Sequence, residues 1–131
     1  MLFSKWLLSH VLSLLVAVPA LAQMGWIEIG QQDGVRYEMN PKVQVSGAAS
    51  SVVAYELWLT PPQEINGVRS SKVQVIARCE SRSQALSQIE TFNNQGLSIK
   101  VTDYDISDPS AWETPKQDIL GKAFRMACEG R

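Results

Sequence analysis

The chain has 131 residues, 45% of them hydrophobic and 19% charged, with a formal net charge of −1. This length corresponds to one modest domain and excludes a two-domain nucleotide-binding enzyme, a barrel enzyme and a multi-span transporter. The nearly balanced charge gives no general argument for nucleic-acid binding, which requires a strongly basic face or domain.

The first 22 residues have the pattern of a signal peptide. Lys5 precedes an apolar run over residues 6 to 18, and Ala20-Leu21-Ala22 is a small-x-small cleavage site. We therefore expect cleavage there and a mature domain over residues 23 to 131, located in the periplasm or secreted. The run is short for a membrane anchor of about 20 residues. We therefore expect no stable membrane span after cleavage. As a separate point, no cysteine near the site could be acylated to form a lipid anchor.

Removal of this segment takes away His10, the only histidine of the sequence. Without histidine, neither a Ser-His-Asp nor a Cys-His nucleophile can form in the mature domain. Two cysteines cannot complete a structural zinc tetrad. We therefore expect a protein that is not an enzyme and that binds no cofactor, and we expect no metal site built from histidine or cysteine.

Short β-like runs alternate with turn residues along the mature chain, a pattern typical of antiparallel strands. The first strands are predicted over residues 25 to 29, 35 to 39 and 43 to 45. Gln32-Asp33-Gly34 is a hairpin signal, and Asn40-Pro41 ends the second strand because proline donates no ladder hydrogen bond.

Two longer runs, residues 52 to 59 and 71 to 78, are predicted to form the centre of the sheet. Successive side chains of a strand point to opposite faces. This alternation places Tyr55 and Trp58 on opposite faces and puts Cys79 on the core side.

Residues 84 to 93 are ambiguous between helix and strand. The apolar residues fit a helical stripe, but Leu86 and Phe92 also fit one face of a strand. The turn Asn94-Gln95-Gly96 and the alternation over residues 97 to 101 favour a hairpin. We therefore predict a strand here.

The C-terminal segment predicts a helix. Thr114 is a suitable N-cap, Pro115 suits the first helical position, and Gln117 completes a capping box. Asp118 suits the positive end of the helix dipole. Apolar residues follow at helical spacing: Leu120, Ala123, Phe124 and Ala127.

Cys79 and Cys128 are the only cysteines of the sequence. In an exported domain an even pair is most simply a disulfide, whereas a redox-active pair favours the C-x-x-C spacing that is absent here. The bond would tie the last turn of the helix to a strand. The predicted fold is α+β: a small, curved antiparallel β-sheet of about six strands, a C-terminal α-helix packed on it, and one disulfide.

Four basic residues crowd one stretch of the chain, opposed only by Glu80: Arg69, Lys72, Arg78 and Arg82. A local basic patch of this kind could bind acidic protein segments, sulfated glycans or lipid phosphates. The alternative is an ordinary solvated strand face whose charges discourage edge-to-edge pairing.

Asp103, Asp105 and Asp108 share one loop, and carboxylates at this spacing could hold Ca²⁺. The loop lacks the glycine and the distal glutamate of an EF-hand, so calcium binding stays an open alternative. General acid/base catalysis by the same carboxylates would need a cleft in which two carboxyl groups have different surroundings and therefore different pKa values. The pattern does not indicate such a cleft.

Several aromatic, turn and cysteine residues follow one another along the predicted mature chain in an order that can be compared with known families. They are Trp26, Tyr37 to Asn40, Leu57-Trp58-Leu59, Ser70-Ser71-Lys72, Cys79, Phe92 with Gly96, Trp112 with Pro115, and Cys128. In this order and spacing the chain resembles the bacterial surface-adhesin protein E-like family over most of residues 23 to 131. It departs from the family in three places: it lacks a lipid-anchor cysteine, it has Pro115-Lys116-Gln117 where Pro-Gly-Ser is expected, and it has Asn40 where aspartate is common.

The resemblance implies an exported domain that binds extracellular-matrix and serum proteins at the bacterial surface. We therefore expect a non-enzymatic binding domain that contacts protein or glycan ligands through the outer face of its sheet and the basic stretch. The alternative is a periplasmic structural or accessory protein of the cell envelope with no host ligand, which the missing lipid anchor favours.

Overall fold

The structure is a computed structural model that describes residues 25–40, 43–45 and 51–129. The expected signal peptide over residues 1 to 22, Pro41 and residues 46 to 50 lie outside this range. The elements in chain order are β1 (Ile27–Gln32), β2 (Val35–Met39), β3 (Gln44–Val45), β4 (Val52–Thr60), β5 (Ser70–Arg78), β6 (Ser83–Phe92), β7 (Ser98–Asp103), the 3-10 turn η1 (Pro109–Ala111), β8 (Trp112–Glu113) and the helix α2 (Ile119–Glu129).

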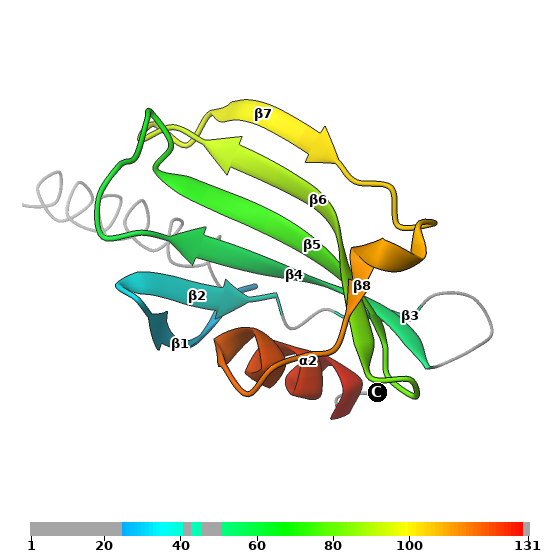
Figure 1. The fold of residues 1–131 in the computed structure, drawn as a ribbon. Helices are drawn as coiled ribbons and strands as arrows, with labels where there is room; N and C mark the ends of the chain where they lie inside the picture. The colour runs from blue at the N-terminus through cyan, green and yellow to red at the C-terminus, as the bar shows by residue number, and fades with distance from the viewer. Residues whose placement is uncertain (1–24, 41–42, 46–50, 130–131) are drawn as a thin grey trace, which may run out of the picture.

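The described strands form an antiparallel sheet in the order β1-β2-β4-β5-β6-β7, with β3 added to β4 and β8 added to β6. Figure 1 shows that the sheet curves and that α2 lies against one of its faces, below β2 and β4. β1 and β7 lie at the two ends of this order, so the sheet is not closed. The predicted α+β fold, a curved antiparallel sheet with a C-terminal helix packed on it, is confirmed.

The first hairpin follows from its turn residues. Asp33 (φ 54°) and Gly34 (φ 79°) both adopt positive φ, as a two-residue type I′ turn requires, and Asp-Gly is a favoured sequence for it. The turn sets the register of β1 against β2, so that β1 continues up to the turn. The prediction of a first strand over residues 25 to 29 was therefore placed too early, because β1 covers Ile27–Gln32.

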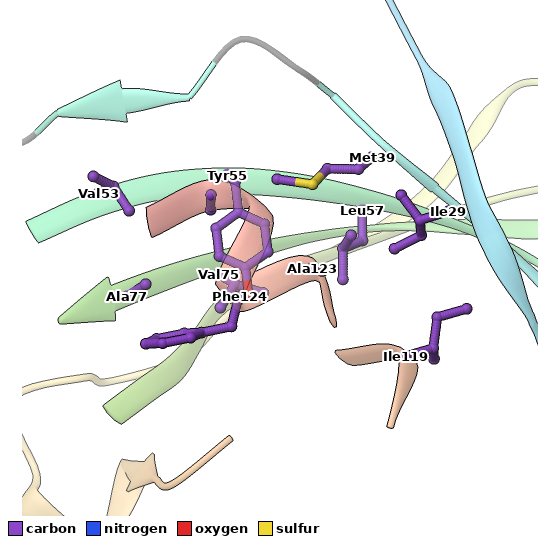
Figure 2. Close-up of a cluster of buried hydrophobic side chains, with 11 residues drawn as sticks. Ile29, Met39, Val53, Tyr55, Leu57, Val75, Ala77, Ile119, Ala123 and Phe124 are labelled. Carbon is purple, nitrogen blue, oxygen red and sulfur yellow. The ribbon is translucent and has the colours of Figure 1, made fainter. Parts of the chain in front are cut away.

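Alternation along the strands divides the sheet into two faces. The helix face packs against α2, and Figure 2 shows buried side chains from both layers: Ile29, Met39, Val53, Tyr55, Leu57, Val75, Ala77, Ile119, Ala123 and Phe124. Ala127 of α2 belongs to the same buried cluster. The opposite face of the sheet, away from α2, is called the outer face. The side chains that define this outer face are Glu56, Trp58, Lys72, Glu90 and Phe92.

Residues 83 to 92 form the strand β6, but its faces differ from the prediction. The register between β5 and β6 shifts after Gln74 because Ser87 is an extra residue, a β-bulge. The Ser87 hydroxyl donates to the Gln74 carbonyl at 3.2 Å. The extra residue shifts the alternation of side chains along β6 by one position. Leu86, before the bulge, therefore points to the helix face, and Phe92, after it, points to the outer face. The prediction that both share one face was wrong.

α2 begins four residues later than predicted, at Ile119. The residues before it are not helical: Trp112 and Glu113 pair with β6 as β8, and Pro115 disfavours helical dihedrals at Thr114. Asp118 is the N-cap instead, since its Oδ1 accepts a hydrogen bond from the Gly121 N–H at 3.0 Å. The prediction of a capping box at Thr114 and Gln117 was therefore wrong.

A disulfide joins the end of α2 to the sheet. Cys79 follows β5, Cys128 lies in the last turn of α2, and their Cα atoms are 5.7 Å apart. The Cys79 N–H donates to the Ser51 carbonyl at 2.7 Å, which holds the end of β5 beside the start of β4. The predicted disulfide is confirmed. α2 has 11 residues, and the part of the chain that the structure describes contains no helix long and apolar enough to cross a membrane.

Candidate functional site

Lys72, one of the four predicted basic residues, lies on the outer face between two carboxylates. Its Nζ is 3.4 Å from Glu90 Oε1 on β6 and 3.9 Å from Glu56 Oε2 on β4. Strand pairing causes this arrangement, because Lys72 lies directly opposite Glu90 in the β5–β6 ladder. The positive charge of Lys72 is therefore neutralised locally.

The three predicted arginines lie at opposite ends of β5, with Arg69 before its start and Arg78 and Arg82 at the β5–β6 turn. Arg69 donates through Nη1 to the Pro61 carbonyl at 2.8 Å in the connection between β4 and β5. Arg78 lies at the other end of β5, about 30 Å from Arg69 along an extended strand, and its guanidinium carbon is 3.6 Å from the centre of the Trp112 ring. Arg82 lies in the β5–β6 turn and lines a hollow beside α2. The structure therefore does not bring the four residues together in one patch.

An aromatic cluster, formed by Trp26, Trp58 and Phe92, occupies the outer face next to the Lys72 ion pairs. Trp58 stacks on Phe92 with ring centres 4.8 Å apart, and Trp26 meets Trp58 edge to face at 5.5 Å. All three side chains are half-buried. Alternation along β4 predicted the orientation of Trp58, but Phe92 reaches this face only because of the bulge at Ser87. The outer face thus combines aromatic rings with charges of both signs.

A hollow of about 680 Å³ opens between β1 and α2. Its basic lining residues come from the β5–β6 turn, the loop before α2 and α2 itself: Arg82, Lys116, Lys122 and Arg125. Sequence analysis singled out Arg82 alone among them. Lys122 and Arg125 are three residues apart on the side of the helix opposite its apolar stripe, a spacing that could have indicated a shared surface.

A second hollow of about 240 Å³ lies on the helix face between α2 and β6. Its lining is mainly aliphatic: Leu57, Leu59, Val73, Val75, Leu86, Ile89 and Leu120. Tyr55 forms part of its wall, where the Tyr55 hydroxyl donates to Gln84 Oε1 at 3.2 Å. Burial raises the pKa of this phenol. The hollow exists because the main contacts of α2 are with β1 and β4, so that the β5–β6 side of the helix face is less covered.

The three aspartates considered as calcium ligands each accept hydrogen bonds from a different residue. Asp103 accepts a hydrogen bond from a β6 side chain at 2.8 Å. Asp105 accepts from the hydroxyl and the N–H of Ser107, and these bonds lower the pKa of its carboxyl. Asp108 accepts from the N–H and the hydroxyl of Ser110, with the same effect on its pKa. Among the residues that the structure places, no three acidic, histidine or cysteine side chains gather as metal ligands do. The structure therefore gives calcium binding no support.

Comparison with protein-family models, with curated proteins and with solved structures gives no match for this chain. The resemblance to the surface-adhesin protein E-like family therefore stays a prediction from the order and spacing of residues such as Trp26, Trp58 and Cys128. The outer face and the two hollows are the features of the described residues on which a functional proposal can be built.

Proposed function

We propose that this chain is an exported, non-enzymatic binding domain of the surface-adhesin type, which contacts a protein or glycan ligand through the outer face. The signal-like pattern of residues 1 to 22 supports export. The lack of histidine beyond this segment supports a binding role over a catalytic one, because histidine is the commonest general acid or base. The resemblance to the surface-adhesin protein E-like family, which rests on the order of aromatic and cysteine residues, supports a ligand in the extracellular matrix.

The aromatic cluster on the outer face is the observation that carries this proposal. A tryptophan side chain offers a large apolar area together with an N–H donor, and tryptophan is enriched among the residues that contribute most to binding. Lys72 lies opposite Trp58 in the β4–β5 ladder, with Glu56 and Glu90 on either side of it. A ligand on this face would therefore meet apolar contacts bordered by charged groups, as in many protein interfaces.

Truncation of Trp26 tests the proposal, because Trp26 precedes β1 and its loss removes an aromatic contact without interrupting a strand. We expect Trp26→Ala to weaken binding to immobilised matrix proteins or glycans by about tenfold or more, as for a central aromatic contact. Surface plasmon resonance measures the affinity. Ile65→Ala is the matched control, since Ile65 is an exposed apolar residue (56%) in the connection between β4 and β5. The control should leave the affinity unchanged.

Equal affinity of Trp26→Ala and the natural chain would contradict the assignment to the outer face. Absence of binding to every matrix protein and glycan tested, with co-purification of an envelope protein, would favour a structural or accessory protein of the cell envelope. Turnover of a substrate by the purified domain would contradict the non-enzymatic role. An intact mass on protein from the periplasm, outer membrane and medium gives the cleavage position and the compartment.

A further inference from the structure

The hollow between β1 and α2 concentrates positive charge on a chain whose net charge is −1. Arg82, Lys116, Lys122 and Arg125 line it and define the cationic hollow. Lys122 links the two elements, because its Nζ donates to the Ile29 carbonyl of β1 at 2.8 Å. Arg125 folds back along the helix, with Nη1 3.4 Å from the position that a Cβ would occupy at Gly121. Both charges are thus held near the first turns of α2.

These four cations form no ion pair with any carboxylate of the described residues, whose ion pairs involve Arg36 and Lys72 instead. Asp118 also lines the hollow, but its carboxylate accepts the hydrogen bond from the Gly121 N–H. On the outer face, by contrast, Lys72 is neutralised by two glutamates. Like charges that face one hollow repel each other, so an anion between them would relieve this repulsion.

The N-terminal N–H groups of α2 are not the basis of the site. The Ile119 N–H donates to Gln32 Oε1 at 3.2 Å, and the Gly121 N–H donates to Asp118 Oδ1 at 3.0 Å. An anion would therefore be bound mainly by the four basic side chains, which reach the hollow from three separate segments.

We propose that the cationic hollow binds a compact anion, a phosphate or sulfate monoester group carried on a small polar molecule. Guanidinium and ammonium groups bind such oxyanions through charge-assisted hydrogen bonds. The volume of about 680 Å³ is typical of small-molecule sites, which measure roughly 300 to 1,000 Å³. A long polyanion would extend beyond the hollow over a chain with 13 acidic against 12 basic residues, which disfavours it. The site lies away from the outer face and does not depend on the proposed function.

Titration of the purified protein with glucose 6-phosphate, inorganic phosphate and inorganic sulfate tests the proposal. We expect saturable binding by calorimetry, and amide chemical-shift changes by nuclear magnetic resonance that centre on Gly30, Gly121 and Lys122. Lys116→Gln/Arg125→Gln should weaken the binding by about tenfold or more, as expected when two charge-assisted contacts are removed.

Arg36→Gln/Lys100→Gln is the matched control, since it removes the same two charges from residues that do not line the hollow. Its affinity should stay within about twofold of that of the natural chain, because distant exposed charges are screened by salt. Melting temperatures of both variants verify that they fold. If Lys116→Gln/Arg125→Gln, the hollow variant, does not fold, Lys116→Gln alone replaces it and should also weaken the binding of the anions.

Binding of the soluble anions that is lost in the hollow variant and kept in the control supports the site. Binding only to vesicles with a phosphate-ester headgroup, lost in the same variant, also supports it and identifies a lipid as the source. Absence of saturable binding to all of these probes would overturn the proposal. Equal weakening in the control, or tighter binding of a long sulfated polysaccharide or an acidic peptide than of the small anions, would overturn it as well.

Discussion

Tyr55 lies at the centre of the helix face with 2% of its surface exposed. Its hydroxyl donates to Gln84 Oε1 at 3.2 Å, and Gln84 is itself buried, so one hydrogen bond satisfies two buried polar groups. Burial raises the pKa of the Tyr55 phenol. The pKa of Tyr37 is raised too, first by burial and then by the negative charges of Asp118 and Asp33. Each phenol is therefore held in its neutral form.

The raised pKa makes the stability sensitive to alkaline pH. In the unfolded chain Tyr55 ionises near its ordinary pKa of 10.0, whereas in the folded chain it stays neutral to higher pH. The free energy of unfolding should therefore be fully retained below pH 10 and fall as the pH rises above it. Tyr55→Phe should reduce this decline, with Tyr37 contributing the remainder, and should cost about 1 kcal/mol at neutral pH. Urea unfolding on both sides of pH 10 measures this, and an unchanged decline in Tyr55→Phe would contradict it.

At the scale of single elements, α2 shows how its surroundings determine where a helix begins. The loop before α2 packs back onto its first turn, so closely that a Cβ at Gly121 would overlap the Lys116 carbonyl. This approach requires glycine at the third helical position, even though glycine disfavours a helix by about 1 kcal/mol relative to alanine. Asp118 then caps the turn from outside.

The position of the cap can be tested by two alanine substitutions. Asp118→Ala should lower the free energy of unfolding by about 1 kcal/mol, the usual cost of losing an N-cap side chain. Thr114→Ala should change it by less than about 0.5 kcal/mol, because Thr114 is exposed and lies outside the helix. Urea unfolding measures both values. A larger loss for Thr114→Ala than for Asp118→Ala would show that the helix begins at the earlier position.

At the scale of the whole molecule, α2 is attached to the sheet at both ends. Hydrogen bonds from Ile119 and Lys122 join its start to β1, and the bond between Cys79 and Cys128 joins its end to the sheet just beyond β5. The disulfide spans 49 residues of sequence and encloses β6, β7, β8 and most of α2. It therefore restricts the unfolded chain over almost half of the described residues.

Removal of the disulfide should destabilise the domain strongly. For a loop of 49 residues the chain-entropy relation gives a loss of about 4 kcal/mol for Cys79→Ala/Cys128→Ala. Urea unfolding of this variant, compared with the natural chain with and without a reducing agent, measures the effect. A loss below about 1 kcal/mol would mean that the bond adds little beyond the packing of α2.

Local signals in the sequence by themselves determined much of the fold. The Asp33-Gly34 turn, the alternation over residues 52 to 59 and the pair Cys79 and Cys128 were predicted correctly. Turn dihedrals and the two-residue period of a strand depend on a few neighbouring residues, and two cysteines allow one intramolecular pairing.

Only the tertiary structure decided to which face each side chain of β6 points, where α2 begins and which residues come together in each candidate site. Phe92 reaches the outer face through a bulge whose position depends on pairing with β5. α2 begins only after Trp112 and Glu113 have paired with β6 and the following loop has packed back onto the first turn of the helix. The predicted basic stretch is dispersed, while Arg82 lines the same hollow as Lys116 and residues of α2. These outcomes arise from strand pairing and packing between distant segments, which no local window of sequence contains.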